Sequence, residues 1–191
     1  MIARPAPRRH GNAGVWALVA IGLLVAANTN NPASPRAGDP AGGPPASAGV
    51  RPPAGLTFTS AAGCHPAGDY PSPRLDRRVR ALLVATATQH RIRVSCIRTG
   101  HSRYVAGTRR VSNHTVWRAV DVDQVDGQAV SRSNAAAREL ALWIGHGRAG
   151  VQPSEVGSPW DFGPRPWFTD AGHQDHLHVG FAGPTQAGGG R

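Results

Sequence analysis

Two clusters of histidine and aspartate, far apart in the chain, contain the residue types of a metal site. The first spans residues 112–121 and the second residues 175–178. Neutral imidazole is the commonest metal-binding side chain, and two histidines with one carboxylate are the ligand set of a catalytic zinc that keeps one position open for water. His114, Asp121 and His178 can supply that set.

The second cluster has the pattern of a half-buried strand over residues 176–181. In an extended strand, residues two apart point the same way, so His176 and His178 would share one face while Leu177 lies on the apolar face. A lone histidine is usually explained by ordinary hydrogen bonds, and the chain has 9 of them. The combination of a His-x6-Asp element with an Asp-His-x-His element is what favours a metal site.

The first cluster also resembles a known signature. Residues 112–121 are similar to the Ser-x-His-x-x-Gly-x-Ala-x-Asp motif of zinc D-alanyl-D-alanine peptidases, whose fold is shared by the zinc-binding domain of hedgehog proteins, and residues 175–178 resemble the closing motif of that family. The resemblance covers about residues 56–183. The positions that match the family's zinc ligands are His114, Asp121 and His178.

The resemblance also implies catalytic roles. An acidic residue three positions before the last ligand is often the general base in this family, and here that residue is Asp175. Beside the metal, His176 could donate a hydrogen bond to a developing oxyanion. The run 95–99 is similar to a Ser-Gly-Tyr-Arg-Ser segment, which makes Arg98 the residue that steadies the substrate or transition state. His173 corresponds to a histidine that some endopeptidase relatives use in catalysis; otherwise it would orient a ligand.

One position departs from the family pattern. Trp117 stands where the family has glycine, so a bulky side chain would narrow the cleft or mark a member that has lost activity. Ser112, Arg98 and Trp117 form the expected substrate-binding set. Asp123 shares a strand face with Asp121 and is the competing ligand, but the family pattern favours Asp121.

The chain divides by composition into four parts. Residues 1–27 have the arginines and the apolar run 14–27 of a signal peptide, which predicts export, with an uncleaved membrane anchor as the alternative. Residues 28–55 are rich in Pro, Gly and Ala and predict a disordered linker. Residues 56–183 form the expected zinc peptidase-like domain, and residues 184–191 a flexible tail.

Cysteine content agrees with export. Cys64 and Cys96 are the only cysteines, and in an oxidising compartment an even pair most simply forms a disulfide. Such a bond would contribute on the order of 3 to 4 kcal/mol. The alternative, a cysteine-containing metal or nucleophile site, lacks a CxxC motif or a histidine at readable spacing.

The charge is strongly basic, with a formal net charge of +10 in which every positive side chain is arginine. A basic surface attracts polyanions. For an exported chain we expect an anionic cell-envelope polymer rather than nucleic acid, and a monomer.

Periodicity predicts both helices and strands, and the resemblance to the hedgehog and D-Ala-D-Ala peptidase fold implies an α+β fold, a small antiparallel sheet with helices packed on one side. The helices are expected at 74–89 and 134–145, the second with Ser133 as N-cap. Asp126-Gly127 predicts a hairpin turn, and residues 146–172 a long loop lining the cleft. The strands are expected at 91–97, 118–125 and 176–181.

The function that follows is an exported zinc hydrolase that cleaves an amide bond in peptidoglycan stem peptides with metal-activated water. Carboxypeptidase, dipeptidase and endopeptidase relatives share the ligands, so the bond cleaved, D,D or L,D, stays open. Two other classes also stay open: a zinc-holding domain that binds cell wall or a partner without cutting, favoured by Trp117, and a basic nuclease or nucleic-acid binder.

Overall fold

The computed structural model describes residues 50–59 and 63–183. The predicted targeting segment, the linker up to residue 49 and the tail 184–191 lie outside the described residues. Residues 50–55 contain no helix or strand, and strand β1 begins at Leu56. None of the helices in the described part of the chain has the length and apolarity needed to cross a bilayer.

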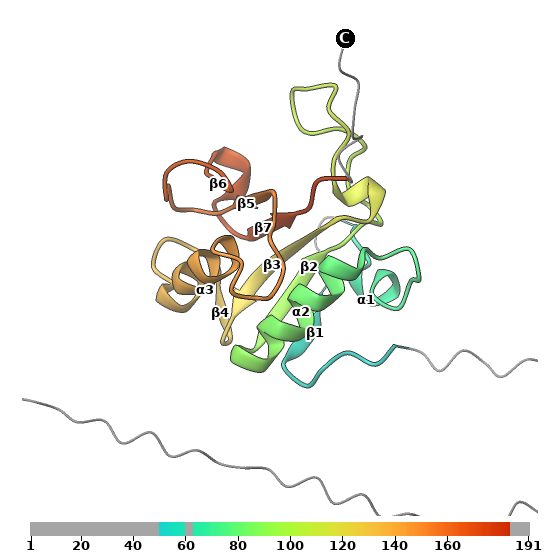
Figure 1. The fold of residues 1–191 in the computed structure, drawn as a ribbon, viewed down its shortest axis with the longest axis horizontal. Coiled ribbons are helices and arrows are strands. Elements are labelled where there is room, and N and C mark those ends of the chain that lie inside the picture. Colours follow the sequence, from blue (N-terminus) through green and yellow to red (C-terminus); the bar gives the residue numbers. More distant parts are fainter. Residues whose placement is uncertain (1–49, 60–62, 184–191) are drawn as a thin grey trace, which may run out of the picture. The chain divides into compact units, whose positions relative to one another are not determined.

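A single mixed sheet forms the centre of the fold (Figure 1). Its spatial order is β1-β2-β3-β7-β5-β6, with β4 paired to β3. The strands are β1 (Leu56–Phe58), β2 (Ile92–Cys96), β3 (Ala119–Val125), β4 (Gln128–Ala129), β5 (Glu155–Gly157), β6 (Trp167–Phe168) and β7 (Leu177–Gly180).

The α+β class is confirmed, but the expectation of an antiparallel sheet is wrong at two pairings. Strands β1 and β2 are parallel, as are β5 and β6, whereas the pairs that involve β3 or β7 are antiparallel. A parallel pair needs a crossover connection, and the segment between β1 and β2 contains a long helix. The predicted loop 146–172 contains β5 and β6, which are too short to show a periodicity.

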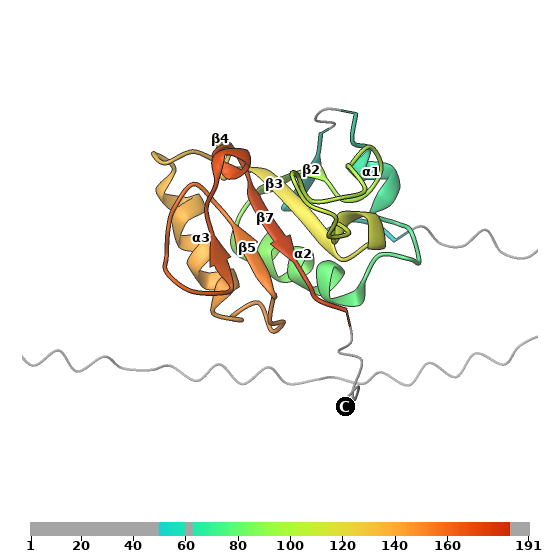
Figure 2. The same ribbon diagram turned by 90° about the horizontal axis from the view of Figure 1, so that it is seen from above.

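Two helices cover one face of this sheet. Helix α2 (Arg77–Gln89) and helix α3 (Ala135–Gly145) lie on the same side of the strands, which the view from above shows in front of them (Figure 2). Their buried side chains join those of the strands in one hydrophobic core. The shorter helical segments are α1 (Pro66–Asp69), η1 (His114–Val116) and η2 (Ala171–His173).

Both long helices begin at a capping side chain. The Asp76 carboxylate accepts a hydrogen bond from the backbone N–H of Arg78 at 2.8 Å, so α2 begins at Arg77 and not at residue 74. Asn134, rather than the predicted Ser133, caps α3 by accepting from the Ala137 N–H at 3.0 Å. Its amide nitrogen also donates to carbonyl groups of the β3–β4 hairpin, which explains why asparagine is the cap.

Along β3 and β7, side chains point alternately to the hydrophobic core and to the opposite face of the sheet, where the candidate ligands lie. Val120 pairs with Val179 in the β3–β7 register, and both side chains are buried in the core with the helices. The next pair along, Asp121 and His178, therefore points to the opposite face. The predicted hairpin turn is present, with positive φ at Asp126 and Gly127.

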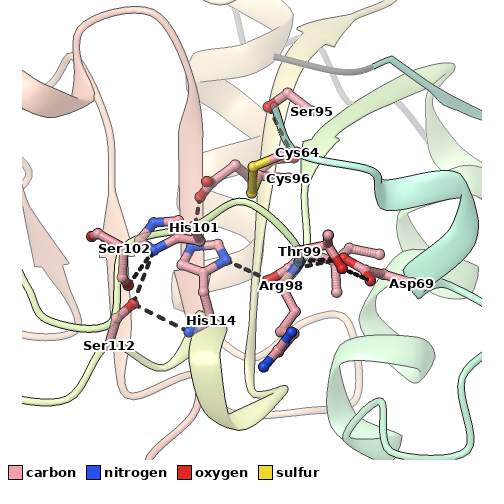
Figure 3. Close-up of a disulfide and its surroundings, with 12 residues drawn as sticks. Cys64, Asp69, Ser95, Cys96, Arg98, Thr99, His101, Ser102, Ser112 and His114 are labelled. Atoms are coloured by element: carbon pink, nitrogen blue, oxygen red, sulfur yellow. Dashed lines mark hydrogen bonds and ion pairs between the residues drawn. A yellow bond between two sulfur atoms is a disulfide. The ribbon is translucent and has the colours of Figure 1, made fainter. Parts of the chain in front are cut away.

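The predicted disulfide is present, with an S–S distance of 2.00 Å between Cys64 and Cys96. Cys96 ends β2, and the chain that follows is held by the buried carboxylate of Asp69, which accepts hydrogen bonds from the backbone N–H groups of Arg98 and Thr99 (Figure 3). These contacts fix the direction in which the chain leaves the sheet.

Candidate metal centre

The face of the sheet opposite the helices contains a cleft of about 650 Å³. Its volume lies in the range of small-molecule and peptide sites. Histidine is the commonest residue type in its lining. The histidines that line it are His101, His114, His173, His176 and His178, together with Asp121.

The three predicted metal ligands meet in this cleft. Nε2 of His114 lies 3.1 Å from Nδ1 of His178, and these two nitrogens lie 3.2 Å and 3.0 Å from Oδ1 of Asp121. All three side chains are buried. The donor atoms thus form a nearly equilateral triangle, although 57 residues separate Asp121 from His178 in sequence.

The size of this triangle fits a tetrahedral divalent ion. Ligand atoms at the usual zinc distances of about 2.0 to 2.1 Å lie roughly 3.3 Å apart around a tetrahedral centre. The three observed separations are 3.0 to 3.2 Å. Two imidazoles and one carboxylate at these separations therefore fit three of the four ligand positions of zinc.

The short helix that begins at His114 and two hydrogen bonds orient the His114 ring toward this triangle. The short helix η1 begins at His114, directly before β3, and its ring is fully buried. Nδ1 of the ring lies 2.6 Å from the carbonyl oxygen of Ile97, to which it donates, and the Ser112 hydroxyl accepts from the His114 backbone N–H at 3.3 Å. Because Nδ1 is the donor, Nε2 is free to accept a metal.

A carboxylate that the sequence did not indicate orients His178. Oε1 of Glu155 lies 3.2 Å from Nε2 of His178, on the side of the ring away from the triangle. The same oxygen accepts from the Asn113 amide at 2.6 Å, and Oε2 accepts from Arg110 at 3.1 Å. A carboxylate–histidine–metal arrangement of this kind fixes the tautomer and raises the basicity of the ligand.

Interactions within the cluster shift the pKa values of Asp121, His178 and Glu155. Burial disfavours the Asp121 carboxylate, but His114 and His178 more than offset this and hold its pKa well below the usual range. Burial likewise disfavours charge on His178, yet hydrogen bonds to Asp121 and Glu155 raise its pKa to about 9. The His178 hydrogen bond, with smaller help from Asn113, lowers the pKa of Glu155 to about 2. The Asp121 carboxylate thus borders the position where a cation would bind, and the Glu155 carboxylate lies behind His178.

Three more histidines surround the triangle. The ring of His101 stacks on His114 with centroids 3.9 Å apart, and burial lowers its pKa. Burial also lowers the pKa of His173, against the opposing effect of Asp170, whose Oδ1 lies 2.6 Å from Nδ1. His176 places Nε2 3.9 Å from Oδ1 of Asp121, close to the proposed metal position.

The predicted general base lies outside the cleft lining. The side chain of Asp175 is 88% exposed, and its carboxylate contacts Nδ1 of His176 at 2.8 Å. Asp175 lies just before β7, and its carboxylate orients the ring of His176. The His176 ring lines the cleft beside the metal triangle.

Arg98 and Trp117 are also placed away from the metal triangle. The guanidinium group of Arg98 stacks on the Trp117 ring at 5.5 Å and turns away from His101 and His114 (Figure 3). Neither residue lines the 650 Å³ cleft, so Trp117 does not narrow it. Trp117 has φ 64°, a conformation that favours glycine.

The other predicted residues fall into place as follows. Ser112 and His173 both line the cleft. The competing ligand Asp123 is paired with Arg93 at 2.9 Å and does not reach the triangle. The residues that sequence reasoning missed are Glu155, Asn113, His101 and Asp170.

Cys96 lies beside the ligands but is engaged elsewhere. Its sulfur, one nitrogen of His114 and one oxygen of Asp121 lie within 4.8 Å of one another. Because the sulfur is bonded to Cys64, it offers no thiolate. With Cys96 held in the disulfide, the third side chain available beside His114 and Asp121 is His178. A comparison with protein-family models, curated proteins and solved structures finds no match for this chain.

Proposed function

We propose that this chain is an exported zinc-dependent hydrolase that cleaves an amide bond in peptidoglycan stem peptides. The observation that carries the proposal is the triangle of His114, Asp121 and His178, whose donor atoms lie 3.0 to 3.2 Å apart on the floor of an open cleft. A site that only holds a metal is usually closed by a fourth protein ligand. Here the fourth direction opens onto imidazoles and solvent.

A zinc ion bound there would polarise an amide carbonyl and lower the pKa of a water to about 7. Histidine side chains of the cleft would then accept and donate the protons of the reaction. His176 is the nearest candidate for the general base, because Asp175 holds its Nδ1 and leaves Nε2 directed at the site. His173, whose Nδ1 is held by Asp170, is the second imidazole in the cleft, and in its protonated form Nε2 could donate to a leaving amine or an oxyanion.

The cleft suits a peptide with carboxylate groups. Arg110 and Arg165 line it as positive charges, and Trp167 and Phe168 form an aromatic wall. Arginine binds carboxylates well because its planar fork matches their geometry. The resemblance of residues 112–121 and 175–178 to zinc D-alanyl-D-alanine peptidases is what assigns the peptide to peptidoglycan, and an anionic envelope polymer remains the proposed wider partner.

The test compares two aspartates on the same strand. Asp121→Asn should lower both zinc binding and release of products from purified muropeptides by more than the roughly 10- to 100-fold that loss of an outer-shell partner costs, because it removes the charge of a direct ligand. Asp123→Asn makes the same chemical change two residues along β3, outside the triangle, and should retain activity. Mass spectrometry of the products, with and without a chelator, would also identify the bond that is cut.

The test separates this function from a non-cleaving role. His176→Ala should retain zinc and lose hydrolysis, whereas a domain that only binds cell wall would hold zinc and wall and give no products in any variant. Equal hydrolysis by wild type and Asp121→Asn would refute the proposed metal chemistry. Salt-sensitive binding to nucleic acid without muropeptide cleavage would favour the nucleic-acid alternative.

A further inference from the structure

The disulfide lies in register with the metal ligands. Cys96 pairs with Asp121 across β2 and β3, and Asp121 pairs with His178 across β3 and β7. Residues paired across neighbouring strands project from the same face. The three side chains therefore form one continuous row. His114, labelled with Cys96 in Figure 3, joins this row from the segment before β3.

The sulfur of Cys96 is close enough to become a ligand. It lies within 4.8 Å of the donor atoms of His114 and Asp121, and the residue is 4% exposed. Around one zinc, with a zinc–sulfur distance of about 2.3 Å, sulfur and nitrogen ligands are roughly 3.5 Å apart. The sulfur would need to move by up to about 1.3 Å toward His114 and Asp121, which a change in χ1 can supply once the bond to Cys64 is broken.

From this arrangement, we propose that the Cys64–Cys96 disulfide keeps the metal site open, and that its reduction closes the site with the Cys96 thiolate as a fourth protein ligand. The inference rests on the metal triangle of the proposed function. Three protein ligands leave a position for water, whereas four ligands including a thiolate form a structural site. The oxidised chain would be hydrolytic and the reduced chain would hold metal without reaction.

The chemistry balances with an external reductant. A trialkylphosphine and one water convert the disulfide into two thiols, the phosphine being oxidised to its oxide by two electrons. Cys96 then gives up its proton as it binds the metal. Because disulfides persist in oxidising compartments and are rare in reducing ones, this chain would act only after it reaches an oxidising environment.

Cobalt(II) is the probe, because a thiolate ligand gives it an intense near-ultraviolet charge-transfer band that imidazole and carboxylate do not. Cys64→Ser and Cys96→Ser form a matched pair: each removes the disulfide and the constraint it places on the unfolded chain, and they differ only in which thiol remains. Cobalt-loaded Cys64→Ser should show the band and hydrolyse muropeptides at least tenfold more slowly than Cys96→Ser. Cys96→Ser and oxidised wild type should lack the band.

Reducing the wild-type chain with the phosphine provides a second measurement that needs no variant. The phosphine contains no thiol, so any thiolate band must come from the protein. The band should appear on reduction and disappear on reoxidation. Cobalt bound without the band in both Cys64→Ser and reduced wild type, or cobalt lost on reduction, would overturn the inference. Those outcomes leave the proposed function intact if oxidised wild type still binds cobalt and cleaves peptide, whereas failure of oxidised wild type to bind cobalt would remove both.

Discussion

Glu155→Gln tests whether the carboxylate behind His178 tunes the metal site. The substitution keeps the shape of the side chain and removes its charge. The amide oxygen can still accept from His178 and Asn113, which both contact Oε1 in the native chain, at 3.2 and 2.6 Å. The contact with Arg110 is lost, but that arginine is 58% exposed and the pair is worth at most about 1 kcal/mol.

The expected effect on metal binding is larger than the effect on folding. A hydrogen bond to a charged partner contributes about 1.5 to 3 kcal/mol and a neutral one about 0.5 to 1.5 kcal/mol, so His178 loses about 1 to 2 kcal/mol of support. Loss of a carboxylate behind a ligating histidine typically costs about 10- to 100-fold in metal affinity, or about 1.4 to 2.7 kcal/mol. We therefore expect zinc affinity to fall about 10- to 100-fold.

The assay is a zinc titration in competition with a chelator at pH 7, where Glu155 is ionised because its pKa is about 2. Glu139→Gln is the matched control, since Glu139 is the only other glutamate in the chain and is exposed on α3. It should bind zinc like wild type. Equal affinity for wild type and Glu155→Gln, or equal losses in both variants, would refute the positioning role of Glu155.

Three further predictions concern packing, capping and the departure from the resembled signature. Gly157→Ala would place a methyl group 2.6 Å from Cδ2 of His173 and should destabilise the fold by about 1 to 3 kcal/mol in thermal unfolding, whereas Gly68→Ala, which meets no atom within 4 Å, should have a much smaller effect. Asp76→Ala should cost about 1 kcal/mol in denaturant unfolding at pH 7 and Asp76→Asn less, because asparagine still caps α2. The pKa of Asp76 is lowered chiefly by Arg78, so the ionic part of its contribution is present above the unfolded pKa near 3.8 and should fade as the pH falls through the lower folded value. Trp117→Gly should leave zinc affinity unchanged in the same competition titration, since the ring lies outside the cleft; a loss like that of a ligand variant would show that Trp117 shapes the site.

The meeting of the three candidate ligands could be predicted from sequence because local patterns encode it. The strict alternation around Asp121 and His178 places both on the polar face of their strands, and strand pairing then sets them side by side. The predicted helices and strands are present for the same reason, with shifts of a few residues at their ends. The N-cap at Asn134 was missed because its partners lie in the β3–β4 hairpin rather than in the helix alone.

What could not be predicted depends on short strands and on the directions of chain ends. Glu155 lies in a strand of three residues, too short for a period of two to be recognised. Asp175 was expected to act as the base, and its carboxylate is exposed and contacts Nδ1 of His176 outside the cleft lining. Arg98 follows β2, and its direction is set by backbone hydrogen bonds to Asp69, a contact between segments that no spacing indicates.

The position of β7 in the sheet has a consequence for how the molecule matures. This last strand of the described domain lies between β3 and β5 rather than at an edge, and it contributes His178. A chain in which β7 has not yet joined the sheet would hold His114 and Asp121 as a two-ligand half-site. Metal capture would thus be a late step in biogenesis, and metal retention would report that the strand order is complete.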